Sequence, residues 1–287
     1  MKTSLRSNRS NAAIGSSNDA FTRIELVTVI AVVAVLVAIF LPALSEARPT
    51  DKAIVCLNNG RQLVLGWILY ANDNHGGLVT PLNDGSAQTR NRPIYVNGDI
   101  SDYANRGNTN ISVITNGPLF TYTQRALDIY KCPSDDSANG QLSGLNHAGT
   151  PRVRSLSMNE AFGFGSWLPS TKYRLYSKTA DVVNPSKTFV TVDEHPDSIN
   201  DDSLSVQMVD PGAVTGSLID LPSSLHQGAS AFTFADGHSE AHRWLSSKLK
   251  QAVHYQTDGA SLVVPISAPD GSLQDARWLS DHTTVLK

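Results

Sequence analysis

The sequence predicts an α+β protein, in which a long N-terminal transmembrane helix packs onto an antiparallel, β-rich globular head. Two observations predict the helix. Residues 26–45 contain no charged side chain and no polar face, and residues 56–70 repeat apolar side chains at helical spacing. The head is predicted from a middle region rich in Asn, Ser, Thr, Gly and Asp, which is typical of short strands joined by turns.

The composition restricts the class of protein. A chain of 287 residues is long enough for one sizeable domain or two small ones, and its formal net charge is -3. So small a charge gives no general attraction for nucleic acid, and no basic patch interleaved with aromatic residues is present. There is also no nucleophile elbow, Walker loop or dinucleotide-binding glycine pattern. We therefore expect neither an enzyme nor a nucleic-acid partner.

The N-terminal region reads as a polar leader followed by a membrane-spanning helix. Residues 1–20 have no apolar periodicity, and basic side chains predominate among their charges. The uncharged stretch at about 26–45 would form roughly 30 Å of helix, enough to cross the core of a bilayer. Because positive charge precedes it, the N-terminus is expected in the cytoplasm. This predicts a single-pass protein of the inner (cytoplasmic) membrane with a periplasmic head.

One carboxylate, Glu25, lies at the cytoplasmic edge of the uncharged stretch. A charge at that position is costly unless it has a partner, which favours a functional role. The position also allows a simpler interpretation, in which Glu25 marks the start of the helix and reaches the lipid headgroups.

Residues 20–31 resemble the type III signal of type IV pilins and type II secretion pseudopilins. With Phe21 as the first mature residue, Glu25 and Pro42 fall where pilins carry Glu and Pro. The resemblance implies that a prepilin peptidase cuts between Ala20 and Phe21 and methylates the new amino group. It further implies that Glu25 neutralises this amino group in a neighbouring subunit during filament assembly, which agrees with the need of a buried charge for a partner.

Two residues depart from the pattern of that family. Ala20 stands where the family usually has Gly, and Arg23 replaces the usual Leu. Ala is small, so cleavage remains compatible with the sequence. Arg23 could instead pair with Glu25 within one helix, which would compete with pairing between subunits.

The N-terminal helix should cover residues 21–72 and the head residues 73–287. Pro42 predicts a kink, and Pro49 predicts a further interruption. Apolar residues at helical spacing should then dock the helix onto the head, and a turn-rich cluster at 72–77 should end it. Parts of 56–74, 130–135, 155–159, 193–202 and 226–244 resemble a branch of pseudopilin-like proteins with long heads.

Three strands are predicted in the head, near residues 188–192, 205–209 and 231–235. Asp236-Gly237 suits a type I′ turn, so residues 231–244 should form a hairpin, with Trp244 packed against the head. The weak alternation after about residue 251 assigns no element.

Cys56 and Cys132 are the only two cysteines. No Cys-x-x-Cys pair is present, so a thiolate zinc site is not expected. In an exported chain the two should form a disulfide that ties the helix to the head, whereas in a cytosolic chain they would be two unrelated buried thiols.

No metal site or cofactor is predicted, although two segments contain ligand-type residues. The run 193–202 offers Asp193, His195, Asp197 and Asp201 as weak candidates for Ca²⁺, but it lacks the EF-hand spacing, and a solvated turn explains it as well. In residues 238–242 the Glu comes one place late for a metalloprotease motif. A strand there would hold the two His about 13 Å apart.

The resemblance thus implies a structural subunit that a prepilin peptidase processes. Together with other pilin-like subunits and an assembly platform, it would form a type II secretion or type IV pilus-like filament. One alternative is a secreted or membrane-tethered binding protein, with residues 1–47 as a conventional signal peptide cut after Ala47. Another is a metal-dependent hydrolase that uses residues 193–202 with His226, Asp236 or His238.

Overall fold

The computed structural model describes residues 22–82, 91–96, 106–138, 149–163, 168–254 and 263–287, without the side chains of 39–51. The helices are α1 (Arg23–Asp73), α2 (Ser112–Thr115) and α3 (Ser272–Thr283), with short 3₁₀ turns between them. The strands are β1 (Leu156–Asn159), β2 (Phe189–Asp193), β3 (Ser203–Leu204), β4 (Thr215–Leu218), β5 (Ala229–Phe234), β6 (Ser239–Arg243) and β7 (Val264–Ser267). The α+β class is therefore observed.

The second part of α1, residues 52–73, belongs to the head. The chain divides into two compact units, Met1–Ala47 and Arg48–Lys287, with the boundary inside α1. The predicted docking face is confirmed, because Cys56, Leu63, Trp67 and Tyr70 are all buried. The helix ends at Asp73, within the turn cluster that the sequence indicated.

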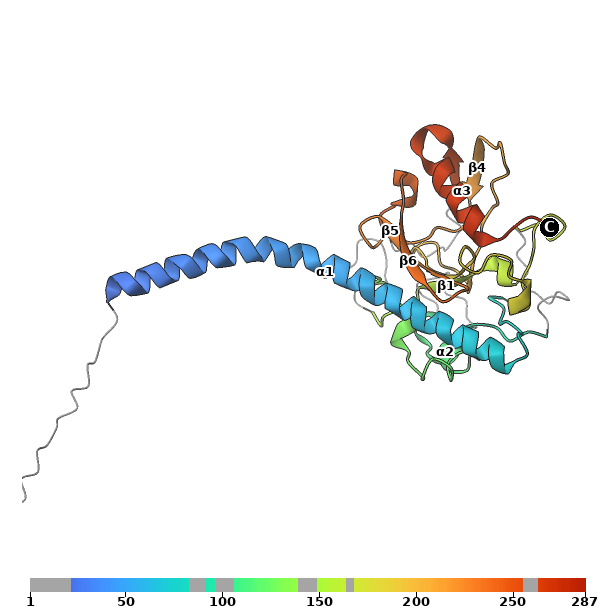
Figure 1. The fold of residues 1–287 in the computed structure, drawn as a ribbon, viewed down its shortest axis with the longest axis horizontal. Coiled ribbons are helices and arrows are strands. Elements are labelled where there is room, and N and C mark those ends of the chain that lie inside the picture. The colour runs from blue at the N-terminus through green and yellow to red at the C-terminus, as the bar shows by residue number, and fades with distance from the viewer. Residues whose placement is uncertain (1–21, 83–90, 97–105, 139–148, 164–167, 255–262) are drawn as a thin grey trace, which may run out of the picture. The chain divides into compact units, whose positions relative to one another are not determined.

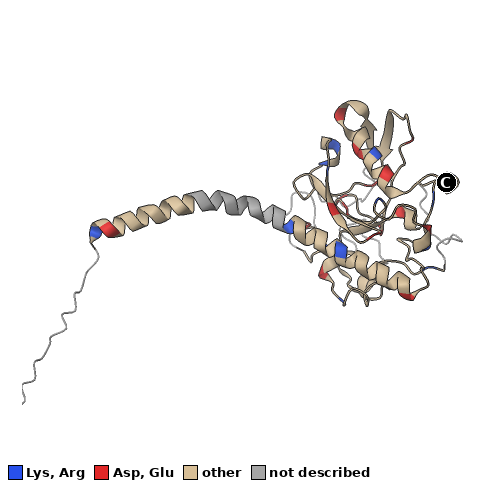
Figure 2. Cartoon of the chain, in the orientation of Figure 1, with Lys and Arg blue, Asp and Glu red and all other residues tan. Residues whose placement is uncertain are grey.

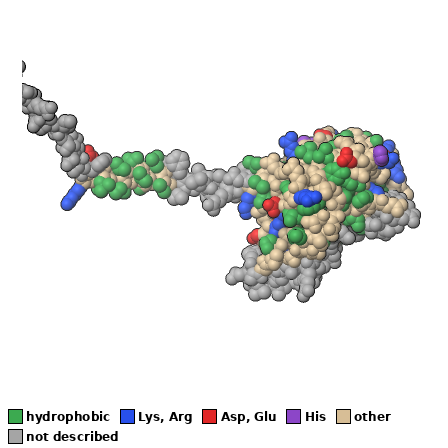
Figure 3. Space-filling model, turned by 90° about the horizontal axis from the view of Figure 1, so that it is seen from below, with side chains coloured by type: hydrophobic (Ala, Val, Ile, Leu, Met, Phe, Trp, Pro, Cys, Tyr) green, Lys and Arg blue, Asp and Glu red, His purple; other side chains and the backbone are tan. Residues whose placement is uncertain are grey.

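The first part of α1, residues 23–38, has a different surface. Apart from Arg23 and Glu25 in its first turn, its described residues are uncharged (Figure 2). Figure 3 shows hydrophobic side chains along it. The large ones are all exposed: Ile24, Leu26, Val27, Val29, Ile30, Val32, Val33, Val35, Leu36 and Val37.

Within the described residues, no helix combines the length and the hydropathy that crossing a membrane requires. The predicted transmembrane segment at 26–45 is contradicted by this finding. So are the single-pass inner-membrane location with a periplasmic head and the pseudopilin interpretation in so far as it assumed a membrane anchor.

The kink predicted at Pro42 lies outside the residues whose side chains are described. The helix assignment of α1 continues without a break from Arg23 to Asp73. The interruption predicted at Pro49 is therefore not found in that assignment.

The main sheet has five strands in the order β3-β1-β2-β5-β6. Figure 1 labels β1, β5 and β6 of this sheet. Its neighbours are antiparallel except for β1 and β3, which are parallel. The sheet is thus mixed, and the prediction of a purely antiparallel sheet is wrong. The reason is that the chain leaves β2 through a long loop and returns to the free edge of β1 in the same direction as β1.

The predicted strands near 188–192 and 231–235 correspond to β2 and β5. The hairpin is confirmed, since β5 and β6 pair around Asp236-Gly237. The predicted type I′ turn is not formed there, because Gly237 has a positive φ of 94° but Asp236 does not. Trp244 is buried, as expected. The strand predicted at 205–209 is not formed, and only Ser203–Leu204 pairs there.

Helices cover both faces of the sheet. The described part of α1 near the sheet packs with Met158 and Val190, whereas α3 packs with Phe232 and Phe234 on the other side. A small antiparallel sheet, β4-β7, joins α3 on that second side. Of these elements, β7 and α3 lie after residue 251, where the sequence assigned no element, and β4 lies before it and was not predicted.

Candidate functional site

Two of the predicted processing residues, Ala20 and Phe21, lie outside the described residues. Glu25 is described and lies exposed in the first turn of α1. Its Oε2 accepts hydrogen bonds from the backbone N–H and the Oγ1 of Thr22, both at 2.8 Å, and its own N–H donates to Thr22 Oγ1 at 3.3 Å. This reciprocal pair caps the helix. The bond from the Thr22 backbone, followed by that from its hydroxyl, lowers the pKa of Glu25.

The pairing of Glu25 with Arg23 that the sequence allowed is not formed. Among the described residues, no ion pair joins these two side chains, and the carboxylate of Glu25 bonds to Thr22 instead. The role of Glu25 in assembly stays a prediction.

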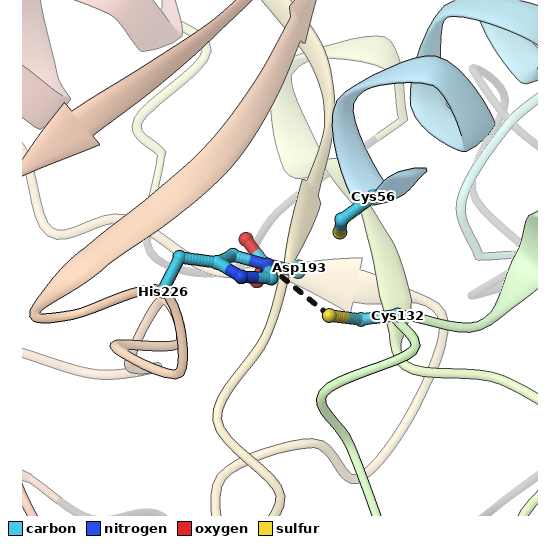
Figure 4. A group of neighbouring side chains, drawn as sticks. All are labelled: Cys56, Cys132, Asp193 and His226. Atoms are coloured by element: carbon cyan, nitrogen blue, oxygen red, sulfur yellow. Dashed lines mark hydrogen bonds and ion pairs between the residues drawn. The ribbon is translucent and has the colours of Figure 1, made fainter. Parts of the chain in front are cut away.

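A second group of polar side chains lies inside the head. It consists of Cys56, Cys132, Asp193 and His226, whose ligand atoms all lie within 4.8 Å of one another (Figure 4). The first three are 0% exposed and His226 is 6% exposed. We call this group the Cys₂AspHis cluster.

Each member of the Cys₂AspHis cluster comes from a different segment. Cys56 lies on the buried face of α1, and Asp193 is the last residue of β2. Cys132 follows a 3₁₀ turn, and its N–H donates to Ser155 Oγ at 2.7 Å. His226 precedes β5, so the cluster joins one helix, the sheet and two loops.

A tight turn places His226. The two residues after it, Gln227 and Gly228, have φ values of 56° and 81°, and the backbone of His226 bonds to that of Ala229 in both directions. Two successive residues with positive φ define a type I′ turn, in which Gly carries no steric cost. The turn brings the imidazole back against the end of β2.

One nitrogen of the His226 imidazole, Nε2, contacts both Cys132 and Asp193. Its Nε2 lies 3.2 Å from Cys132 Sγ and 3.3 Å from Asp193 Oδ2, while Nδ1 lies 3.5 Å from Ser134 Oγ. In a nucleophilic triad the carboxylate contacts the nitrogen opposite to the one that faces the nucleophile. Here thiol and carboxylate converge on the same atom, and Cys132 is fully buried. The arrangement is that of a set of ligands around one point.

Hydrogen bonds set the protonation of the cluster. The pKa of Cys132 is lowered to about 7, by the hydrogen bond with Cys56 and, against the effect of burial, by that with His226. The pKa of Cys56 is raised, first by the same bond to Cys132 and then by burial. Burial alone would lower the pKa of His226, but Asp193 and Cys132 raise it to about 10. The lowered pKa of Cys132 favours its thiolate form, and the raised pKa of His226 favours its imidazolium form.

The predicted disulfide is not present, because Cys56 and Cys132 are both free thiols in the structure. The sequence correctly placed the two sulfurs in different segments of the head and helix, but it did not indicate that Asp193 and His226 join them. The sequence provided no reason to expect a thiolate metal site, because it has no Cys-x-x-Cys pair. In the structure, however, the two cysteines lie together with Asp193 and His226.

The other candidates for a calcium site do not gather around one point. Asp197 accepts from the N–H of His254 at 2.6 Å, and Asp201 accepts from that of Ser203 at 2.7 Å. The His195 ring bonds to the backbone of Asp197 and Gln251. The contact of Asp201 satisfies local backbone, whereas Asp197 and His195 also bond to backbone 57 and 56 positions away. The segment is mostly buried, so the expectation of a solvated turn is wrong.

The residues weighed for a hydrolase are separated. Asp236 and His238 bond to each other at 2.6 Å in the turn between β5 and β6. His242 stacks on Trp278 with ring centroids 3.6 Å apart. The strand predicted at 238–242 is observed as β6, Ser239–Arg243, with His238 just before it. Only His226, of the three, lies with Asp193.

No protein-family model, no curated protein and no solved structure matches this chain. Function is therefore argued from α1 and from the Cys₂AspHis cluster.

Proposed function

We propose that this protein is a pilin-like structural subunit, which is cleaved before Phe21 and assembles with other pilin-like subunits through residues 23–38 of α1. The observation that carries the proposal is the contrast within α1. Its second part is built into the core of a globular head, whereas its first part exposes every large apolar side chain that is described.

A helix that exposes this much apolar surface is unfavourable in water unless other apolar groups pack against it. Large contiguous apolar surfaces mark interaction sites, and each Å² of apolar surface removed from water contributes about 25 cal/mol. An amphipathic helix is covered from one side only. The first part of α1 is apolar around its circumference, so one partner helix would leave most of it in water. Several neighbouring helices, as in the core of a filament, would cover it.

The charges at the start of α1 fit a copy of the same segment. Cleavage before Phe21 would create an ammonium group close to Glu25, the acidic residue in the first turn. In helices packed side by side, the carboxylate of one chain can pair with the ammonium group of the next. A buried ion pair of this kind fixes register, because a misplaced helix would leave both charges unpaired.

The test compares cross-linking of full-length wild type and Glu25→Gln at equal expression. The substitution removes the charge but preserves the size and the oxygen that Thr22 bonds to. Glu240→Gln is the matched control, since Glu240 is an exposed carboxylate on β6. We expect multimer ladders to fall several-fold in Glu25→Gln alone. Equal ladders in all three chains would refute the role of Glu25 in assembly.

A further inference from the structure

The Cys₂AspHis cluster has no part in the assembly of α1, yet it is the most concentrated group of metal-ligand side chains among the described residues. We propose that Cys56, Cys132, Asp193 and His226 bind one zinc-like divalent cation, which fastens α1 to the sheet of the head. This proposal is independent of the proposed function.

The donor atoms select the class of metal. Two sulfurs, one imidazole nitrogen and one carboxylate oxygen suit a borderline-soft ion such as Zn²⁺, whose structural sites take four ligands of these kinds. Calcium and magnesium prefer shells of oxygen atoms and would not select two thiolates. The Ca²⁺ considered for residues 193–202 is thus a different ion from the one that this site suits.

The spacing of the donors is close to that of a bound ion. Ligands about 2.0–2.3 Å from a tetrahedral zinc lie roughly 3.3–3.8 Å from one another. The two donors nearest to Nε2 of His226 lie at 3.2 and 3.3 Å, and no pair in the cluster exceeds 4.8 Å. Shifts well below the length of a bond would place all four around one centre.

The surrounding groups orient the ligands. Asp193 Oδ1 accepts from the N–H of Ala231, and its Oδ2 accepts from Ser223 Oγ, both at 2.5 Å. The N–H of Ser134 donates to Cys132 Sγ at 3.4 Å. Ser134 Oγ lies near Nδ1 of His226, on the side away from the other ligands. Outer contacts of this kind fix the orientation of metal ligands in known sites.

The burial of the cluster gives the ion a physical role. Buried charges in proteins are paired with opposite charges or coordinate metals. Two thiols and a carboxylate face a single imidazole in the buried interior, so a divalent cation would balance the anionic forms of the ligands. Because the ligands are dozens of residues apart in the sequence, the ion would also cross-link segments that the unfolded chain leaves separate.

The first test uses the full-length chain, purified with reductant. Co²⁺ is titrated into the metal-free protein, and the visible spectrum is recorded before Zn²⁺ is added as competitor. We expect one ion per chain, a thiolate-to-cobalt charge-transfer band, the strong visible bands of a tetrahedral site, and their loss on addition of Zn²⁺. Absence of the thiolate band in folded, reduced wild type would overturn the proposal. So would a Cys56–Cys132 disulfide that persists under reductant.

Variants assign the ligands. Cys132→Ser and His226→Asn should each weaken Co²⁺ binding by about tenfold or more, and Cys132→Ser should also reduce the intensity of the charge-transfer band. His238→Asn is the matched control, because His238 lies in the β5–β6 turn and bonds to Asp236. Its spectrum should equal that of wild type. A band unchanged in Cys132→Ser, or lost equally in His238→Asn, would place the ion elsewhere.

Discussion

The two described parts of α1 belong to one helix but differ in the burial of their apolar side chains. In residues 52–73, apolar side chains recur on one face, and that face is buried in the head. In residues 23–38, apolar side chains occupy all faces and stay exposed. The comparison teaches that backbone continuity does not imply a common environment: the second part packs into the core of the head, and the first exposes its large apolar side chains.

The largest expected effect concerns the buried part. Trp67 is 2% exposed and packs edge-on against Phe162, with ring centroids 5.4 Å apart. Trp67→Ala should lower the free energy of unfolding by about 3–5 kcal/mol, because it removes a large core side chain and leaves a cavity. Leu69→Ala, at a 53% exposed position on the same helix, should change it by no more than about 0.5 kcal/mol. Denaturant unfolding measures both, and similar losses would break the distinction between the two faces.

Glu160, a buried carboxyl in the same 3₁₀ turn as Phe162, should make the head sensitive to pH. Burial, with a smaller contribution from Asp220, raises the pKa of Glu160 to about 8, whereas an unfolded chain has about 4.3. Between these values the folded state holds the extra proton, so this group makes stability fall as pH rises from about 4.5 to 8.

Glu160→Gln should remove that part of the pH dependence, which amounts to a few kcal/mol at most, since one pKa unit corresponds to about 1.4 kcal/mol. The amide oxygen can still accept the hydrogen bond from the N–H of Val206. Thermal unfolding at about pH 5 and about pH 8 measures the effect, with Glu240→Gln as the exposed control. A slope unchanged in Glu160→Gln would show that this carboxyl is already ionised in the fold.

A closer contact tests how tightly the second part of α1 sits on the sheet. A Cβ added at Gly60 would lie 2.6 Å from Cγ2 of Thr233 on β5. Gly60→Ala should therefore cost about 1–3 kcal/mol by overpacking, in spite of the better helix propensity of Ala. Adding Thr233→Ser removes that methyl group but keeps the hydroxyl, so the double variant should recover part of the loss. Additive losses would mean that the two sites are not in contact.

The smallest effect on stability is expected in the first part of α1. Val33 is 51% exposed, and Val33→Ala should leave the unfolding free energy of the head within about 0.5 kcal/mol of wild type. The same variant should weaken multimer formation, because it reduces the apolar surface offered to neighbours. Loss of head stability with unchanged multimers would reverse the roles assigned to the two parts.

The sequence predicted features that depend on neighbours along the chain. The spacing of Leu63 and Trp67 predicted the buried face of α1, and Asp236-Gly237 predicted the hairpin, because periodicity and turn chemistry are local. The parallel pairing of β3 with β1 depends on where a long loop returns, which no local pattern encodes.

The Cys₂AspHis cluster could not be predicted from the sequence for a similar reason. Its members are far apart in the sequence, and motif spacing detects metal sites only when ligands come in local pairs. The one available signal was the coincidence of two cysteines with a His and an Asp, and the sequence led instead to a disulfide. The case of α1 is different. Its contiguous apolar residues predicted a membrane span, which the described helix does not support.

The proposed function depends on the chain beginning, after processing, at Phe21. Mass spectrometry of the N-terminal peptide of the mature protein tests this most directly. The account predicts a peptide that starts with N-methylated Phe21 and retains the apolar first part of α1. A mature chain that starts at Arg48, after a conventional signal-peptide cut, would lack this segment and contradict the account, and so would a chain that retains Met1.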